Sequence, residues 1–531
     1  MNRADGAASM AEHGAVCPSL VETLPDIPRP VLPYERLRRI GIDTGDEYVI
    51  YLHEDSPLCR AEGFGAHSRV QIAIGERQLL ARLNMVRGAM LTAEEAGLSE
   101  PAWLRLNPQP GESAMFAHPA SIESLALVRG KIHGLALDSG AFAAIMRDVV
   151  ARRYSGLELA AFVTACANGH LSLQEISALT GAMVDTGLHL HWPYEVVADK
   201  HCIGGLAGNR TTPIVVAIAA SLGLAMPKTS SRAITSPAGT ADTMEMLAPV
   251  DLSLEQMRRV VERAGGCVAW GGSIGLSPAD DVMIHVERAL DIDSEGQLVA
   301  SVLSKKIAAG STHVLIDIPV GPSAKVRSQA EADSLAACLQ RVAADFGMRV
   351  QCLVTDGSQP IGRGVGPALE ARDVLSVLRR DADAPADLRE RALLLVTSLL
   401  QLIGVTRNRD SARAMATQAL DSGAAWVQFQ KICEAQGGMR TPGKAAQQYP
   451  VLASVAGRVA AIDNRQLSRV AKLAGAPMAP LAGLELHVHL GDCTEAGQPM
   501  FTVHAQTRGE LAYAMEYVQR HPCIVTLAAG A

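Results

Sequence analysis

The chain has 531 residues, a formal net charge of −7, and 48% hydrophobic, 19% charged and 4% aromatic residues. Its length corresponds to about three or four domains, and this much apolar side chain excludes a mostly disordered protein. The acidic balance and scarce aromatic rings argue against a dedicated nucleic-acid-binding protein. No apolar run reaches the ~18–20 residues that span a bilayer. No secretory leader is visible, and the ten cysteines form no CxxC pair. We therefore expect a cytoplasmic enzyme with no membrane or nucleic-acid partner.

The first part of the chain predicts an arm followed by a small module. Residues 1–34 hold five prolines and predict a flexible arm. Alternating apolar runs at 47–52 and 69–74, broken by Gly, Asp and Pro, predict a β-rich N-terminal module over 35–115. Within it, Thr92-Ala-Glu-Glu95 matches the capping-box pattern and predicts the start of a short helix.

Helical signals follow over 118–195. Two further capping boxes, Ser155…Glu158 and Ser172…Glu175, each precede apolar residues at helical spacing. These patterns predict a small helical domain, which residues from about 278 to 310 are expected to join.

The remainder predicts an α/β domain and a C-terminal module. Over 196–436, short apolar segments (213–224, 268–270, 313–319, 350–355) alternate with helical patterns such as 253–265, which favours a mainly parallel sheet covered on both faces. Over 450–531, alternation at 484–490, a turn at Gly491-Asp492 and a second strand at 499–505 predict an α+β module with a hairpin. The predicted fold class is therefore multidomain α/β.

The densest group of chemical side chains lies between Asp199 and Pro213. Lys200 and His201 supply a charge and a titratable ring, and three glycines let backbone N–H groups converge ahead of an apolar helical run. This arrangement suits a phosphate anion. The alternative is that the glycines only make a strand-to-helix turn; Lys, His, Asn and Arg in the same loop favour the functional interpretation.

A second polar segment follows at 227–242. Hydroxyl and cationic side chains crowd into nine positions: Lys228, Thr229, Ser230, Ser231, Arg232, Thr235 and Ser236. Hydroxyls can hold a phosphate or a sugar, although such runs are often only solvated loops. The paired lysines of Ser301-Val-Leu-Ser-Lys-Lys306 are typical of a solvated helix end. The histidine pairs at 189/191 and 487/489 lack partners at ligand spacing, so we expect no metal.

At these residues the chain resembles the thymidine phosphorylase / AMP phosphorylase family. The resemblance runs from about residue 120 to the end, through DKHCIGG, GNRTTP, KTSSRAITSPAGTAD, SVLSKK and GLELHVHLGDCTEAGQPMFTVHA. The N-terminal module, GNRTTP and SSRAITS are similar to the AMP-phosphorylase-like branch. The resemblance implies phosphorolysis: thymidine and phosphate give thymine and 2-deoxy-α-D-ribose 1-phosphate. It also implies inorganic phosphate as co-substrate, no cofactor, and a homodimer or higher homo-oligomer.

The resemblance also implies roles for individual residues. Phosphate-binding positions of the family fall on Lys200, Gly204, Gly205, Ser230 and Thr240. Positions that line the nucleoside or nucleotide site fall on Gly205, Ser231, Arg232, Ala233, Ile234, Thr235, Ser236, Thr240, Ser301, Lys305 and Lys325. His201 falls on a histidine near the base, and Asp293 would be the proton donor to the base. Lys200, His201 and Asp293 are therefore the expected catalytic residues.

Departures from the family pattern leave the substrate open. Cys202 stands where the family has a phosphate-binding serine, and the family's base-contacting arginine has only Arg288 as a near counterpart. Arg210, Arg232 and Lys325 could hold the 5′-phosphate of a nucleotide such as AMP, which would then yield ribose 1,5-bisphosphate. A further alternative is a phosphoribosyltransferase of similar fold, which would require acidic residues for magnesium pyrophosphate.

Overall fold

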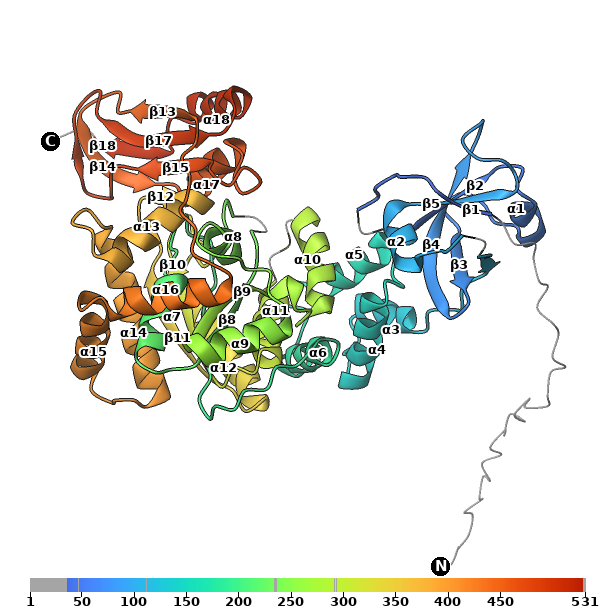
Figure 1. Ribbon diagram of the computed structural model, residues 1–531, viewed down its shortest axis with the longest axis horizontal. Coiled ribbons are helices and arrows are strands. Elements are labelled where there is room, and N and C mark those ends of the chain that lie inside the picture. Colours follow the sequence, from blue (N-terminus) through green and yellow to red (C-terminus); the bar gives the residue numbers. More distant parts are fainter. Residues whose placement is uncertain are drawn as a thin grey trace, which may run out of the picture. The chain divides into compact units, whose positions relative to one another are not determined.

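The computed structural model describes residues 36–528 except 46, 111, 168, 234, 235, 291 and 293. The predicted arm over 1–34 lies outside the described residues. The chain separates into two compact units, Met1–Ser121 and Ile122–Ala531, which are taken in turn (Figure 1).

The first unit is built on a mixed six-stranded sheet in the order β1-β5-β2-β4-β3-β6. Its strands are β1 (Arg36–Arg39), β2 (Val49–His53), β3 (Arg69–Ile74), β4 (Arg77–Val86), β5 (Glu95–Leu98) and β6 (Met115–Ala117), with helices α1 (Pro57–Glu62) and α2 (Glu100–Leu106). Strict alternation in β3 buries Val70, Ile72 and Ile74, as a strand with one core-facing side requires. The β-rich character predicted for this part is confirmed.

The helix predicted from Thr92 is wrong. The backbone N–H of Thr92 donates to Oε2 of Glu95 at 3.0 Å, so the capping-box residues do contact each other. They close a turn instead of a helix, because β5 begins at Glu95 and pairs with β1 on one side and β2 on the other. Pairing along both edges of β5 outweighs the local helix signal, and α2 begins only at Glu100.

The second unit opens with a bundle of helices. These are α3 (Ser124–Ile132), α4 (Ser139–Val150), α5 (Gly156–Ala165) and α6 (Leu173–Asp185). The capping boxes at Ser155 and Ser172 are both present and begin α5 and α6, as predicted. Two later helices, α10 (Pro278–Leu290) and α11 (Glu295–Ala308), pack against this group. A shared apolar core that includes Phe142, Phe162 and Leu303 joins the early and late helices.

A parallel sheet forms the centre of the second unit. Its strands are β7 (Ala198–Cys202), β8 (Met226–Ser230), β9 (Gly266–Trp270), β10 (His313–Val320) and β11 (Arg349–Asp356). β11, β10 and β7 pair in parallel, β8 pairs in parallel with β9, and a bridge between Val197 and Ala225 connects β7 to β8. The resulting order is β11-β10-β7-β8-β9. Open sheets of this kind bind ligands at the carboxyl ends of their strands, where β7 presents the glycine loop.

Helices enclose this sheet. They are α7 (Thr212–Ser221), α8 (Thr240–Glu245), α9 (Leu254–Ala264), α12 (Gln329–Asp345), α13 (Pro367–Arg379), α14 (Ala386–Ile403), α15 (Arg409–Asp421) and α16 (Ala424–Gln436), with a short 3₁₀ turn at Gly271–Ser273. The predicted α9 is confirmed, with Ser253 as its N-cap and Gly265 as its C-cap.

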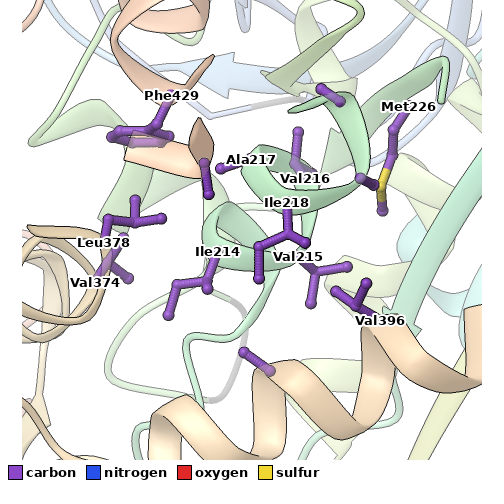
Figure 2. Close-up of a cluster of buried hydrophobic side chains, with 14 of the residues drawn as sticks. Ile214, Val215, Val216, Ala217, Ile218, Met226, Val374, Leu378, Val396 and Phe429 are labelled. Atoms are coloured by element: carbon purple, nitrogen blue, oxygen red, sulfur yellow. The ribbon is translucent and has the colours of Figure 1, made fainter. Parts of the chain in front are cut away.

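Helix α7 is apolar on every side and lies in the middle of the core. Figure 2 shows Ile214 and Ile218 of this helix among Val374, Val396 and Phe429, which come from α13, α14 and α16. A helix that is apolar all round is stable only when other elements surround it. The glycine loop is therefore anchored at its C-terminal end by one of the most deeply buried segments of the chain.

The C-terminal part contains two small antiparallel sheets. Its elements are β12 (Gly364–Val365), β13 (Gln447–Leu452), β14 (Gly457–Ile462), α17 (Asn464–Leu473), β15 (Gly483–Leu486), β16 (Cys493–Thr494), β17 (Pro499–Ala505), α18 (Arg508–Arg520) and β18 (Val525–Ala528). The predicted pairing is confirmed, since Leu484 of β15 is opposite Val503 of β17. The fold class is the predicted multidomain α/β arrangement. In the described part of the chain no helix is long and apolar enough to cross a membrane.

Candidate active site

The loop between β7 and α7 depends on its glycines. Gly204, Gly205 and Gly208 have φ angles of +90°, +79° and +70°, in the left-handed region that disfavours a β-carbon. A β-carbon on Gly205 would lie 2.1 Å from the backbone nitrogen of Lys325, and one on Gly208 would lie 2.6 Å from the carbonyl oxygen of Ile361. The glycines therefore do more than turn the chain: Gly205 lets the Lys325 segment lie directly against this loop.

Lys200 holds a buried charge without an acidic partner. Its side chain is fully buried, and its Nζ donates a hydrogen bond to Oγ1 of Thr211 at 2.9 Å. Among the described residues no carboxylate forms an ion pair with this ammonium group. Burying a charge without a counter-charge is costly, by several kcal/mol or more. An anion bound beside Lys200 would remove that cost.

Asp199, next to Lys200, is the acidic centre of a lysine cluster. Its Oδ1 lies 3.5 Å from Nζ of Lys228, and its Oδ2 lies 2.7 Å from Nζ of Lys306. Burial alone would raise the pKa of Asp199, but the two ammonium groups lower it below its usual value. One carboxylate thus faces two lysines, while the neighbouring Lys200 has no carboxylate partner in the described part of the chain. Burial lowers the pKa of Lys228 well below its usual value, and the charge of Lys306 lowers it further, although Asp199 opposes this. A bound anion would favour the charged form of these lysines.

The solvated helix end predicted for the paired lysines is wrong. Lys306 is only 3% exposed, and Lys305 forms an ion pair with Asp280 at the start of α10. Burial opposes the charge of Lys305, but the attraction of Asp280 raises its pKa above the usual value. Ser301 and Lys305 are one helical turn apart on α11 and so share a face of that helix.

His201 is a neutral imidazole at physiological pH. Burial lowers its pKa well below the usual value, and the positive charges of Lys306, Lys228 and Lys200 lower it further. The charges of four lysines therefore act on the His201 ring: Lys306, Lys228, Lys200 and Lys305. A neutral ring retains one N–H donor and one acceptor nitrogen.

Asn209 is a buried polar residue whose side chain contacts Cys202. Asn209, held at φ +61°, directs its Nδ2 to within 3.5 Å of the Cys202 sulfur and 3.4 Å of Oδ2 of Asp317. Asp317 also accepts a hydrogen bond from Thr355 at 2.6 Å. Burial raises the pKa of the Cys202 thiol to about 11, so it is protonated and can offer only a weak S–H donor.

The Ser/Thr loop between β8 and α8 is closed on itself by Asp242. Its Oδ2 accepts hydrogen bonds from the backbone N–H of Ala233 at 2.7 Å and of Gly239 at 2.8 Å. Oγ of Ser230, at the end of β8, is buried and has no hydrogen-bond partner among the described residues. An unpartnered hydroxyl here is available for a ligand. The predicted site residues Ile234 and Thr235 lie outside the described residues.

The two arginines predicted to hold a 5′-phosphate are both paired with protein groups. Arg232 contacts the carboxylates of Glu245, Asp242 and Asp251 and lies 4.8 Å from the centre of the Trp270 ring. Its hydrogen bond to Glu245 raises the pKa of Arg232 above its already high value. Three carboxylates therefore offset its charge.

Arg210, the other arginine, bridges three parts of the second unit. Its Nε is 2.6 Å from Oε2 of Glu370, its Nη1 donates to Oγ1 of Thr240 at 2.8 Å, and its Nη2 donates to the carbonyl of Ala238 at 2.9 Å. Its side chain is thus committed to protein partners at the Thr240 end of the Ser/Thr loop.

The structure brings together part of the predicted site. Lys200, His201 and Lys305 belong to one electrostatic cluster, and Lys325 lies against Gly205. Asp293 lies outside the described residues, and Arg288 is exposed on α10. Sequence reasoning missed the contributions of Asp199, Thr211 and Asp280. Asp199 and Thr211 stood inside the glycine-loop segment, so they could have been noticed, whereas Asp280 gave no local signal beyond an acidic helix start.

Comparison with known proteins shows the family to which the chain belongs. Residues 194–426 match the model of the glycosyl transferase family a/b domain, and residues 458–523 match that of the pyrimidine nucleoside phosphorylase C-terminal domain. A protein of Ralstonia nicotianae (strain ATCC BAA-1114 / GMI1000), named "Putative thymidine phosphorylase", is 57% identical over 485 residues, covering 91% of this chain and 96% of its own. A protein of the same name from Hahella chejuensis (strain KCTC 2396) is 53% identical over 491 residues, covering 92% and 97%. The chain belongs to the thymidine phosphorylase family.

Family membership confirms the resemblance inferred from the motifs. The matched range 194–426 contains the glycine loop, the Ser/Thr loop and both lysines of α11. Among solved structures, anthranilate phosphoribosyltransferase from Saccharomyces cerevisiae in complex with PRPP and Mg is 14% identical, covers 60% of this chain and 98% of its own, and has a TM-score of 0.49. Nothing about this chain's reaction follows from so distant a likeness.

Proposed function

We propose that this protein is a nucleoside phosphorylase that uses inorganic phosphate to cleave thymidine into thymine and 2-deoxy-α-D-ribose 1-phosphate. The observation that supports the proposal most is the fully buried ammonium group of Lys200, which has no carboxylate partner among the described residues. It lies on the central strand of a parallel sheet, next to a loop of left-handed glycines. Membership of the thymidine phosphorylase family supports the same class of reaction.

In the proposed reaction a phosphate oxygen forms a bond to C1′ as the bond from C1′ to the base nitrogen breaks. The electron pair of the broken bond leaves with the base, and positive charge develops on the sugar in the transition state. Phosphate held against C1′ stabilises that charge. Lys200, the amides of the glycine loop, the unpartnered hydroxyl of Ser230 and the hydroxyl of Thr240 are the proposed phosphate ligands.

The departing base needs the opposite kind of stabilisation. Lys305 keeps its charge through Asp280 and is the proposed partner of the negative charge that develops on the base. The neutral ring of His201 can donate its N–H without adding a charge. In the proposal Asp293 supplies the proton that the base takes up, a role that rests on the family resemblance alone. The reaction requires no organic cofactor.

The pairing of the two arginines favours a nucleoside over a nucleotide. Arg232 and Arg210 were the candidates for binding a 5′-phosphate, and both are already engaged with carboxylates. Recruiting either would leave a carboxylate without its partner, and in the case of Glu370 that carboxylate is buried. Lys325, the third candidate for a 5′-phosphate, has its backbone against Gly205.

One assay tests the reaction and ranks the substrates. Purified protein is incubated with thymidine, uridine, AMP or CMP, with and without inorganic phosphate, and base release is followed by chromatography. We expect phosphate-dependent release that is fastest from thymidine and lost in Lys200→Met. Faster release from AMP or CMP would assign the nucleotide reaction instead. Absence of phosphate-dependent release from all four would refute the proposal, and a magnesium- and PRPP-dependent reaction would favour a phosphoribosyltransferase.

The proposed enzyme assembles as a homodimer or higher homo-oligomer. This assembly rests on the family resemblance, and sedimentation analysis of the purified protein would test it.

A further inference from the structure

The hydrogen bond from Arg210 to Thr240 determines the direction in which the hydroxyl proton of Thr240 points. Nη1 of Arg210 donates to Oγ1 of Thr240 at 2.8 Å. A guanidinium group has five N–H donors and no acceptor, so in this contact the threonine oxygen must be the acceptor. The single hydroxyl proton of Thr240 therefore points away from Arg210. Within the described residues that proton has no acceptor, because the bond from Arg210 is the one contact of this hydroxyl.

Glu370 prevents Arg210 from leaving this position. Its Oε2 lies 2.6 Å from Nε of Arg210 and also accepts a hydrogen bond from Thr243 at 3.2 Å, while its Oε1 accepts one from the backbone N–H of Gly366 at 3.1 Å. Glu370 is only 2% exposed. If Arg210 turned toward a ligand, it would leave this buried carboxylate without a counter-charge. The geometry thus suits Arg210 to orient a neighbour and not to bind an anion itself.

Thr211, the residue after Arg210, makes a similar contact with another proposed phosphate ligand. Thr211 accepts a hydrogen bond from Nζ of Lys200 at 2.9 Å. Two consecutive residues immediately before α7, the second of them its N-cap, therefore hold two of the proposed phosphate ligands: Thr211 holds Lys200, and Arg210 holds Thr240. Because α7 is anchored in the apolar core, both contacts start from a rigid part of the chain.

We infer that Arg210 is a positioning residue that directs the hydroxyl proton of Thr240 at bound phosphate, an inference that rests on the proposed function. Without Arg210, the hydroxyl of Thr240 could rotate and would spend part of its time donating elsewhere. Arg210 acts on phosphate through Thr240, so its contribution to phosphate binding requires the Thr240 hydroxyl.

A double-mutant cycle tests this dependence. Arg210→Lys, which retains a cation for Glu370 but loses the planar fork, is combined with Thr240→Val. The apparent KM for phosphate, the KM for the nucleoside and kcat are measured for each protein, and binding of inorganic phosphate alone is measured by calorimetry. Arg389→Lys serves as a matched control, because Arg389 is an arginine of α14 paired with Asp421 at the surface.

We expect Arg210→Lys to weaken phosphate binding about tenfold when Thr240 is present and less than about twofold in the Thr240→Val background. The KM for the nucleoside and the Arg389→Lys control should not change. An equal loss of phosphate affinity in both backgrounds, or no loss in either, would overturn the inference. If Arg210→Lys does not fold, the charge-neutral pair Arg210→Gln with Glu370→Gln takes its place in the cycle under the same criteria.

Failure of the inference and failure of the proposed function give different results. A wild-type protein that binds phosphate and releases base, with additive effects in the cycle, refutes only the role of Arg210. A wild-type protein that neither binds phosphate nor shows phosphate-dependent release refutes both.

Discussion

Nζ of Lys306 lies 2.7 Å from Oδ2 of Asp199, and this buried ion pair joins helix α11 to strand β7. α11 also carries Lys305, the proposed partner of the departing base, while β7 carries Lys200 and His201, the proposed phosphate and base contacts. The contact therefore ties the two halves of the proposed site together, although more than a hundred residues separate them in the sequence.

Lys200 and Lys306 should respond in opposite ways to loss of their charge. Lys200→Met removes a buried charge that has no acidic partner among the residues that the structure describes. We therefore expect an unchanged or higher melting temperature together with at least about a 100-fold loss in kcat/KM for phosphate. Lys306→Met breaks a buried ion pair and should lower the free energy of unfolding by up to about 3–5 kcal/mol. Thermal denaturation and steady-state kinetics of the two variants check this. Equal destabilisation would show that Lys200 is a structural cation.

Asp280 should act on the nucleoside and not on phosphate. Asp280→Asn retains the shape of the side chain but removes the charge that pairs with Lys305. Lys305 would then lose the attraction that keeps its pKa high despite burial. We expect the KM for the nucleoside to rise about tenfold with little change in the KM for phosphate. A larger effect on phosphate than on nucleoside would remove Lys305 from the base side of the site.

The pH dependence of stability should reflect His201. Burial and the surrounding lysines place its folded pKa well below the unfolded value of 6.5, so the unfolded state binds the extra proton first as the pH falls. The contribution of His201 to the free energy of unfolding is therefore greatest above pH 6.5 and should decline below it, by up to about 1.4 kcal/mol per pH unit. Denaturant unfolding of the wild type and of His201→Gln between pH 5 and 8 (about the range in which histidine titrates) measures the difference. The variant should show a shallower decline. Parallel curves would show that the pKa of the ring is not lowered in the folded protein.

Two adjacent glycines provide a matched pair for the loop geometry. Gly205→Ala places a β-carbon 2.1 Å from the backbone of Lys325, so the segment around Lys325 must move. The β-carbon of Gly204→Ala meets no atom within 4 Å. Its only cost is the backbone strain of a positive φ, about 1–2 kcal/mol. We expect Gly205→Ala to lose most activity while Gly204→Ala retains more of it. Comparable activity of the two variants would mean that the approach of Lys325 to Gly205 is not needed for turnover.

Local signals in the sequence predicted much of the fold. The capping boxes at Ser155, Ser172 and Ser253 involve residues three positions apart, and the strand pair around Leu484 joins nearby segments of the chain, so local patterns carry much of the information. The motif at Thr92 matches the same local pattern as the others, but it does not begin a helix. Its residues do contact each other, but Glu95 begins a strand that pairs with strands elsewhere in the chain. A local pattern contains no information about those partners.

The residue types of the site could likewise be predicted, but not their partners. The positive φ angles of the glycine loop and the grouping of Lys200 with His201 follow from neighbours in the chain. The ion pairs of Lys306 with Asp199 and of Arg210 with Glu370 join positions more than a hundred residues apart. Whether a lysine or arginine remains free to bind an anion depends on which carboxylates the folded chain brings within a few ångströms of it. That proximity results from packing across the whole second unit, and no pattern along the chain encodes it.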